Sequence, residues 1–184
     1  MTLYYISGNF AVIICTMNTD FRIIREDDAP ALIDFMTAIG GDTDNLTFSA
    51  SDFASADQEA ERFAIREMRK GRSVYAIAIT DGKIIGSCTI HTSGDKPRIR
   101  HRAELAIAVR KEFWGTGVAQ HLLEFSLAEA RDRGITKINL EVRADNERAK
   151  TFYRRNGFQP EGTDSRLFYI DGSYVDGERF GLEL

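Results

Sequence analysis

A strand that ends in two closely spaced glycines and then a helix is the feature that most constrains this chain. Residues Ala103 to Val109 form a strand pattern, a charged loop runs from Arg110 to Trp114, and Gly115-Thr116-Gly117 opens a helix with an apolar stripe. Glycine leaves backbone N–H groups uncovered by a side chain. The first four N–H groups of a helix lack partners within it and form its positive dipole end. The stretch therefore predicts a socket for a phosphate or pyrophosphate.

The composition indicates one globular domain and excludes several classes of partner. The 184 residues are 43% hydrophobic and 28% charged, which is enough to build a packed core. The net charge of −4 gives no basic footprint, so we expect no nucleic-acid partner. Cys15 and Cys88 lie far apart and the three histidines are scattered, so we expect neither a disulfide framework nor a metal site.

The first 20 residues differ in pattern from the rest. Residues 3–17 are apolar but are interrupted at Ser7-Gly8-Asn9, whereas a membrane span needs about 20 consecutive apolar residues. No Lys or Arg precedes Arg22, although a secretory signal would carry one. We interpret residues 1–20 as an extension, either an extra strand or a segment ahead of the natural start at Met17, followed by one domain over 21–184. We expect a cytoplasmic protein with no membrane partner.

Hydrophobic periodicity and turn residues predict a mixed sheet with helices. Asp81-Gly82 between two β-rich runs predicts a hairpin, and Gly86 inside the second run predicts a bulge or a close backbone neighbour. Residues 42–57 are polar and are interpreted as a long loop. The expected strands are 21–25, 73–80, 83–91, 103–109, 136–142, 166–170 and 175–184, and the expected helices are 27–39, ending at Gly40-Gly41, 58–69, 118–133 and 146–155.

The connection between strands 103–109 and 136–142 sets the topology. A whole helix separates them, so they form a βαβ unit and should lie parallel, whereas the hairpin strands are antiparallel. The sequence therefore predicts a single α+β domain.

Three families of phosphate site compete for the glycine socket. A Walker-type P-loop needs Lys and Ser/Thr after its last glycine, but Val118-Ala119 follow here, which excludes it. A dinucleotide fingerprint fits the first two glycines but has Gln120 at its third glycine position. Glu141 lies near its ribose-binding offset, so this alternative stays open, although further βαβ repeats are lacking.

Two motifs resemble a third family, the GNAT superfamily of N-acetyltransferases. Residues Trp114 to Ala119 resemble its acyl-CoA loop, Arg/Gln-x-x-Gly-x-Gly/Ala, with Trp114 in place of the Arg/Gln. Residues Asn146 to Phe158 resemble its N-x-x-A-x-x-x-Y-x-x-x-G-F helix, one strand later, as in the family. The resemblance covers about 21–184 and includes a closing hairpin at 171–184. It implies an α+β fold of the three-layer α/β type, with a mixed sheet of about seven strands and four helices.

The resemblance also implies acetyl-CoA as co-substrate, without a metal, and suggests which residues bind it. The implied contacts are backbone groups of Ile107, Ala108 and Val109, the loop residues Trp114, Gly115, Thr116, Gly117, Val118 and Ala119, and the helix residues Asn146, Ala149 and Tyr153. Tyr153 matches the family's general acid for the departing thiolate; the alternative is a core residue at a helix end. Asn146 matches a residue that contacts the pantetheine arm, and it also suits a helix N-cap.

Glu104 is the candidate general base, acting through water. It is an acid in an otherwise apolar strand, and apolar neighbours raise the pKa of a carboxyl group. The alternative is a solvent-facing strand position, and Glu141 is then the next candidate. Cys88 has the chemistry to carry an acyl group, but we interpret it as a buried small residue.

These residues predict an N-acetyltransferase that transfers acetyl from acetyl-CoA directly to a primary amine of a small molecule or a protein N-terminus. The alternatives are a non-catalytic acyl-CoA sensor and a dinucleotide-binding protein. The sequence does not name the acceptor, but Asp42, Asp44 and Asp52 suggest a cationic amine. Homodimers are common in the resembled group, so a homodimer is one expected assembly.

Overall fold

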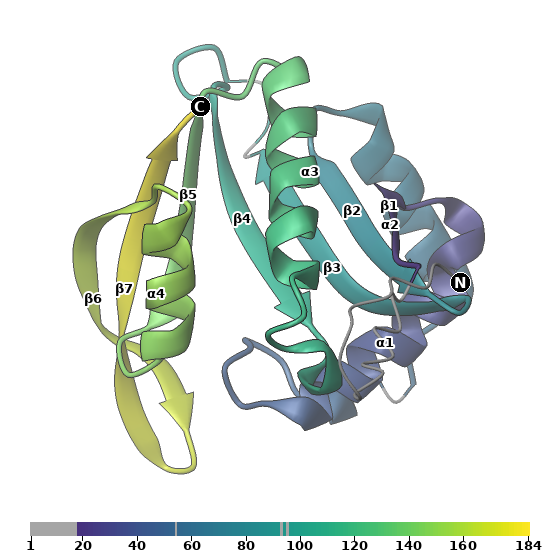
Figure 1. Ribbon diagram of the computed structural model, residues 1–184, viewed down its shortest axis with the longest axis horizontal. Helices are drawn as coiled ribbons and strands as arrows, with labels where there is room; N and C mark the ends of the chain where they lie inside the picture. Colours follow the sequence, from purple (N-terminus) through teal and green to yellow (C-terminus); the bar gives the residue numbers. More distant parts are fainter. Residues whose placement is uncertain (1–17, 54, 93, 95) are drawn as a thin grey trace, which may run out of the picture.

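The computed structural model describes residues 18–53, 55–92, 94 and 96–184. A single sheet runs through them in the order β1-β2-β3-β4-β5-β7-β6 (Figure 1). Only β4 and β5 pair in parallel, and every other neighbouring pair is antiparallel. The strands are β1 (Asp20–Ile23), β2 (Val74–Thr80), β3 (Lys83–Thr92), β4 (Arg102–Val109), β5 (Lys137–Arg143), β6 (Gln159–Ile170) and β7 (Ser173–Glu183).

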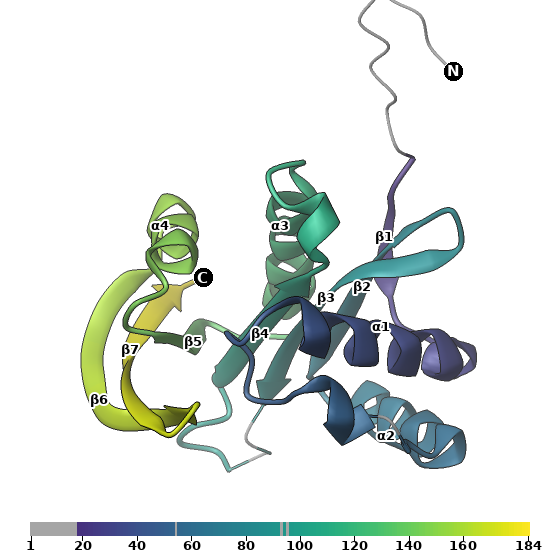
Figure 2. The ribbon, with the colours of Figure 1, turned by 90° about the horizontal axis from the view of Figure 1, so that it is seen from below.

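Helices cover both faces of the sheet. Two of them, α1 (Ala29–Asp42) and α2 (Gln58–Lys70), cover one face, and α3 (Val118–Asp132) and α4 (Glu147–Arg155) cover the other (Figure 2). One apolar core lies beneath α3 and α4, and a second lies beneath α1 and α2. The predicted three-layer α+β fold, with seven strands and four helices in the described residues, is confirmed.

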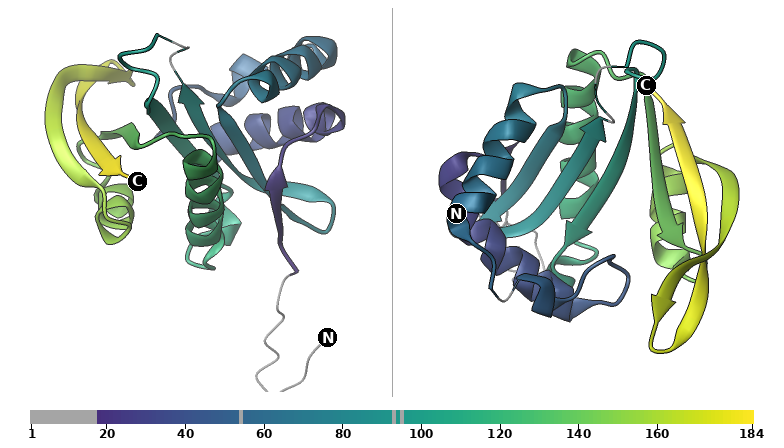
Figure 3. Two further views of the ribbon diagram at one scale, coloured as in Figure 1. Left: turned by 90° about the horizontal axis from the view of Figure 1, so that it is seen from above. Right: turned by 180° about the vertical axis from the view of Figure 1, so that it is seen from behind.

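The two parallel strands separate soon after they begin. β4 and β5 pair only from Arg102↔Lys137 to Glu104↔Asn139. Beyond that point β4 stays with β3 as far as Val109, whereas β5 follows β7 along its whole length. The two strands therefore diverge as a V, which is visible from the front (Figure 1) and from behind (Figure 3). More than half of β4 is left with an edge that none of the described strands covers.

The turn predictions of the sequence hold. Asp81 and Gly82 have φ of 50° and 74°, the positive values that a tight hairpin between twisted strands requires. Asp171 and Gly172 repeat this geometry between β6 and β7, with φ of 49° and 79°. The bulge expected near Gly86 is present, because the β2–β3 register shifts between Ala78 and Ile79.

The end of α1 differs from the prediction. Gly40-Gly41 was expected to stop the helix, but α1 continues to Asp42, and residues 50–53 of the expected loop form a 3₁₀ turn. A side chain at position 40 would place its Cβ 2.5 Å from the backbone nitrogen of Ala50. Gly40 is therefore needed for close packing of the segment that follows the helix, and it does not terminate the helix.

The beginning of β6 also differs from the prediction. The strand begins at Gln159, ahead of the expected residue 166, and the register of its pairing with β7 shifts twice. The breaks lie between Pro160 and Gly162 and between Asp164 and Phe168. This stretch contains Pro and Gly and lacks an alternating pattern, so its strand character comes from the pairing with β7, which sequence periodicity does not report.

Most of the predicted extension, residues 1–17, lies outside the described residues, and so does Cys15. The first described strand, β1, begins at Asp20, one residue before the expected domain boundary. Among the described helices, none combines the length and the apolarity that crossing a membrane requires.

Candidate active site

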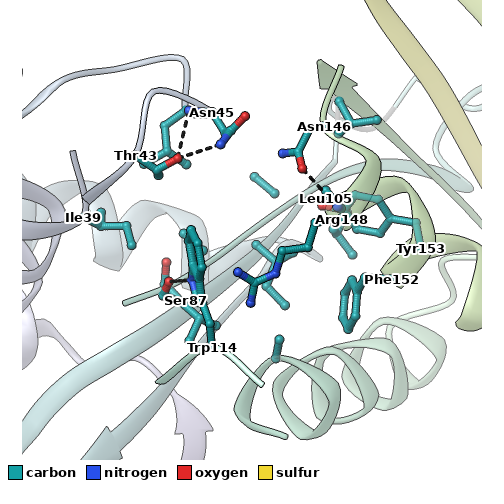
Figure 4. Close-up of a pocket in the computed structure, with 18 of the residues that line it drawn as sticks. Ile39, Thr43, Asn45, Ser87, Leu105, Trp114, Asn146, Arg148, Phe152 and Tyr153 are labelled. Carbon is teal, nitrogen blue, oxygen red and sulfur yellow. Dashed lines mark hydrogen bonds between the residues drawn. The ribbon is translucent and has the colours of Figure 1, made fainter. Parts of the chain in front are cut away.

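A cleft of about 1160 Å³ opens where β4 and β5 diverge. Its floor is the exposed half of β4, and one wall is formed by the start of α3 and by α4. The other wall is formed by α1 and by residues 43–48, the segment named here the strap (Figure 4). Because the walls belong to helices on opposite faces of the sheet, the cleft passes through the sheet.

Backbone groups of β4 point into this cleft at alternate residues. The N–H of Arg110 donates to the carbonyl of Ile85 in β3, at 2.9 Å. A strand residue directs its N–H and C=O to the same side, and successive residues alternate. Ile107 and Val109 therefore direct their N–H groups toward the side that β5 has left. The sequence also predicted a backbone contact from Ala108. Its backbone faces β3 instead, so Ala108 lines the cleft only with its methyl group.

The predicted anion socket is formed at the start of α3. Gly115 and Gly117 have backbone φ angles of 78° and 92°, values that residues other than glycine rarely adopt. Gly117 is the N-cap of α3 and supplies no side-chain cap, so the first N–H groups of the helix remain open to a ligand. Gly115, Gly117 and Ala119 line the cleft.

Two residues of the same loop are turned away from the cleft. The hydroxyl of Thr116 donates to the carbonyl of Phe113 at 2.7 Å, and the side chain of Val118 is buried in the core beneath α3. Either residue can therefore reach a ligand only through its backbone.

Trp114, which replaces the motif's Arg/Gln, joins the two halves of the cleft. Its Nε1–H donates to the carbonyl of Val109 at 2.7 Å. The guanidinium of Arg148 lies 3.9 Å from the centroid of the indole ring, at cation–π distance (Figure 4). Trp114 therefore occupies the Val109 carbonyl of β4 with a hydrogen bond and positions the guanidinium of Arg148, from α4, beside the cleft.

Sequence reasoning missed two arginines of α4. Arg148 and Arg155 both line the cleft, and neither has a carboxylate partner among the described residues. Seven residues are about two helical turns, so both side chains belong to one face of α4, with Phe152 between them. The i, i+4, i+7 spacing of Arg148, Phe152 and Arg155 within the Asn146 to Phe158 motif was the sequence signal that could have identified these two arginines.

Tyr153 lies on the same helix, with its ring in the core. It is 7% exposed and packs against Phe158, with ring centroids 5.6 Å apart. It also lines the cleft, and its hydroxyl has no hydrogen-bond partner among the described residues. Burial raises the pKa of this phenol above its usual value, so the group stays protonated near neutral pH.

The two candidate carboxylates are separated by the divergence of the strands. Glu104 belongs to the last β4–β5 pair, is outside the cleft lining and has Arg102 at 3.6 Å. Desolvation raises its pKa, as its apolar neighbours suggested. Glu141 lies two residues beyond Asn139, where the strands have separated, and it lines the cleft. Only Glu141 is therefore brought to the cleft together with Tyr153.

Comparison with known proteins identifies the family. The model of the Acetyltransferase (GNAT) family matches residues 43–158. The chain belongs to the GNAT acetyltransferase family. A relative from Escherichia coli, named L-amino acid N-acetyltransferase AaaT, is 30% identical over 68% of this chain and 73% of its own. The N-alpha-acetyltransferase RimI of Mycobacterium tuberculosis is 32% identical over 59% of this chain and 66% of its own.

Solved structures agree with this assignment. The crystal structure of a GNAT acetyltransferase from Streptococcus pneumoniae superimposes with a TM-score of 0.85 and 27% identity, over 90% of this chain and 99% of that one. The chain is therefore a GNAT acyltransferase. Among its described residues, no group of three or more His, Cys, Asp or Glu side chains is arranged to hold a metal ion.

In this GNAT domain the end of α1 and the strap are each tied to one of the two diverging strands. Arg110, after β4, donates to Asp42 at 2.6 Å, and Arg143, at the end of β5, pairs with Asp44 at 3.0 Å. Burial acts to raise the pKa of Asp42, but hydrogen bonds from Arg110 and from the Lys111 N–H hold it below its usual value. The third acid of the loop, Asp52, accepts from the N–H and hydroxyl of Ser49. The acids expected to attract an amine are thus bonded within the protein.

Asn146 caps α4, which begins at the next residue. Its Oδ1 accepts the N–H of Ala149 at 3.1 Å, and Asn146 also lines the cleft. Substitution Asn146→Ala should lower the free energy of unfolding by about 1 kcal/mol, measured by urea denaturation, because the cap is lost. Asn146→Asp keeps a capping oxygen and should unfold like the wild type. Equal destabilisation by both variants would contradict the capping role.

Proposed function

We propose that this GNAT domain transfers an acetyl group from acetyl-CoA directly to a primary amine. The observation that carries the proposal is a cleft through the sheet with an anion socket at one side and Glu141 at the other. The residues suit CoA, because open N–H groups at the start of α3 surround the same space as Arg148 and Arg155, which pair with no carboxylate in the described part of the chain. Acetyl-CoA would supply an activated acetyl thioester.

The protein's part in the reaction begins with the amine. Glu141 takes a proton from the ammonium group, directly or through one water, so that the nitrogen lone pair can attack the acetyl carbon. One of the two N–H groups, of Ile107 or of Val109, donates to the oxygen on which negative charge develops, and the other is free to bind the pantetheine arm. A C–N bond forms, and the C–S bond breaks with its electron pair leaving on sulfur. The second proton that the nitrogen loses on becoming an amide passes to the thiolate or to water.

Tyr153 would act on the departing sulfur. Its raised pKa means that the phenol holds its proton more tightly than a thiol, whose usual pKa is about 8.5. Its main effect is therefore a hydrogen bond donated to the sulfur as negative charge develops there. A neutral donor is present over the whole physiological pH range, which favours departure of the thiolate.

A direct transfer is favoured over a covalent acyl-enzyme. Cys88 has no exposed surface, and burial raises the pKa of its thiol to about 12. A reactive cysteine needs an accessible thiolate, so Cys88 is unsuited to carry the acetyl group. Initial rates measured with both substrates varied should give intersecting double-reciprocal lines, as for a ternary complex. Parallel lines would indicate an acyl-enzyme and contradict direct transfer.

The two cleft arginines give a prediction for CoA affinity. Arg148→Gln and Arg155→Gln should each weaken acetyl-CoA binding about tenfold by calorimetry, because each removes a charge-assisted hydrogen bond to phosphate. Arg154→Gln is the matched control, because Arg154 is outside the cleft lining and lies over the ring of Phe180. Loss of affinity in the control but not in the cleft variants would contradict the assignment.

The proposal as a whole is tested by thiol release. The purified chain should bind acetyl-CoA by calorimetry and release free CoA only when a primary amine is added. Binding without release on any amine would favour the sensor alternative, and binding of NAD in place of acetyl-CoA would favour the dinucleotide alternative. Cytoplasmic location and homodimer formation stay predictions.

A further inference from the structure

We propose that the acceptor is an amine with a large apolar substituent and with no free carboxylate on the carbon that bears the amine. This inference rests on the proposed function and specifies the substrate class of the same cleft. It comes from the half of the cleft that lies beneath α1 and the strap.

The amine must approach on the face opposite to the CoA socket. The start of α3 and the helix α4, which carries the two arginines, lie on one face of the sheet (Figure 2). On β5, Leu140 and Val142 are buried in the core beneath α3 and α4, so the intervening Glu141 points to the other face. The proposed base therefore belongs to the half of the cleft that is bounded by α1 and the strap, and the amine must reach it there.

The walls of this half carry mostly apolar side chains, beside Thr43, Asn45 and Thr47 of the strap. The apolar side chains come from four separate elements: α1, the strap, β2 and β6. The wall residues are Met36, Ile39, Leu46, Phe48, Tyr75 and Phe168. The floor of this half carries small side chains. Ala106 and Ala108 of β4 leave the space above them free, and Ser87 and Thr89 lie beside them on β3. Filling such a space with an aromatic or branched side chain removes apolar surface from water, an effect worth roughly tenfold or more in affinity.

The charges of this half disfavour a free amino acid. Among the described residues that line it, Glu141 is the charged one, and no Lys or Arg is present. Arg110 is paired with Asp42 at the end of α1, and Arg143 is paired with Asp44 in the strap. Arg179, which lies opposite Glu141 in the β5–β7 pair, is paired with Asp164 at 3.0 Å. An α-carboxylate bound here would lack a cationic partner and would lie close to the carboxylate of Glu141, which repels it. An ammonium group, in contrast, is attracted.

This specificity differs from what the name of the E. coli relative suggests. That protein is named an L-amino acid N-acetyltransferase. For the present chain we infer that an amino acid amide, a simple arylalkyl amine or a peptide N-terminus is preferred over the free amino acid. These acceptors share the chemistry that the cleft fits, an apolar group on an amine without an adjacent carboxylate.

The test measures kcat/KM for acetylation with the full chain at saturating acetyl-CoA. Phenylalanine amide should exceed both alanine amide and free phenylalanine by tenfold or more. Two further acceptors distinguish a small-molecule substrate from a peptide substrate. Phenethylamine tests the small molecule, and a peptide beginning with Phe, compared with the same peptide beginning with Ala, tests the peptide N-terminus. A preference for free phenylalanine, or for amides with charged side chains, would overturn the inference and leave the proposed function intact. Absence of acetylation on every amine would overturn the proposed function itself.

Variants connect the preference to the wall. Phe48→Ser should reduce the ratio of kcat/KM for phenylalanine amide to that for alanine amide at least fivefold. Met36→Ser in α1, on the same wall, provides the same test if the first variant fails to fold. Phe63→Ser is the matched control, because Phe63 is 60% exposed on α2, outside the cleft lining. An unchanged ratio in folded Phe48→Ser and Met36→Ser would overturn the assignment of the wall.

Discussion

Substitution of Glu141 by Gln is expected to lower kcat at pH 7 by about 100-fold or more. The amide keeps the size and hydrogen-bonding reach of the side chain but cannot accept a proton from an ammonium group, and general base catalysis contributes roughly 10²–10⁴-fold. Binding of acetyl-CoA should stay within about twofold of the wild type by calorimetry, because Glu141 lies on the face opposite to the socket.

Glu104→Gln is the matched control for this prediction. Glu104 is on the neighbouring strand, also carries one carboxylate, and has a raised pKa, yet it lies outside the cleft lining. Its kcat should stay within about threefold of the wild type. If Glu104→Gln lost activity and Glu141→Gln retained it, the base would have to act from outside the cleft through a chain of water, and the assignment proposed here would be rejected.

The contrast between these two acids also shows what the sequence alone could predict. The positions of the strands other than β6 followed from periodicity, and the parallel pairing followed from the length of the connecting helix. The hairpin between β2 and β3 followed from Asp81-Gly82, because tight turns need residues that tolerate positive φ. Where β4 and β5 separate is a tertiary property, since it depends on how far β5 follows β7. Glu104 and Glu141 are separated by that point, so sequence pattern could not rank them.

The contacts across the cleft were unpredictable for the same reason. Trp114 appeared in the sequence as a departure from the acyl-CoA motif, and Arg148 as an ordinary helix residue. Only the fold brings the guanidinium to 3.9 Å from the indole centroid. Likewise, acids of the expected loop could be seen, but their pairing with Arg110 and Arg143 required the two strand ends to be placed.

Substitution Tyr153→Phe is the second change expected to have a large effect, a fall in kcat of about 100-fold. Phenylalanine preserves the packing against Phe158 and Phe180 and removes only the hydroxyl. Loss of one donor to a centre of developing charge typically costs 10²–10³-fold in kcat. Acetyl-CoA affinity and the urea midpoint should change little, which separates a catalytic role from a purely structural one.

The direction of the Tyr153 pKa shift adds a condition that a packing role would not meet. A phenol at its usual pKa of about 10 would lose its proton as the pH rises through 10, and catalysis that depends on it would fall there. Burial raises the pKa of Tyr153, so the hydroxyl stays protonated and kcat of the wild type should show no alkaline decline up to pH 10. Suppose that kcat of the wild type fell with a midpoint below pH 10, while the residual kcat of Tyr153→Phe did not. The phenol would then ionise more readily than burial allows, and the pKa argument would be wrong. Equal kcat in the two proteins across the whole range would remove Tyr153 from the reaction and leave it as a core residue of α4.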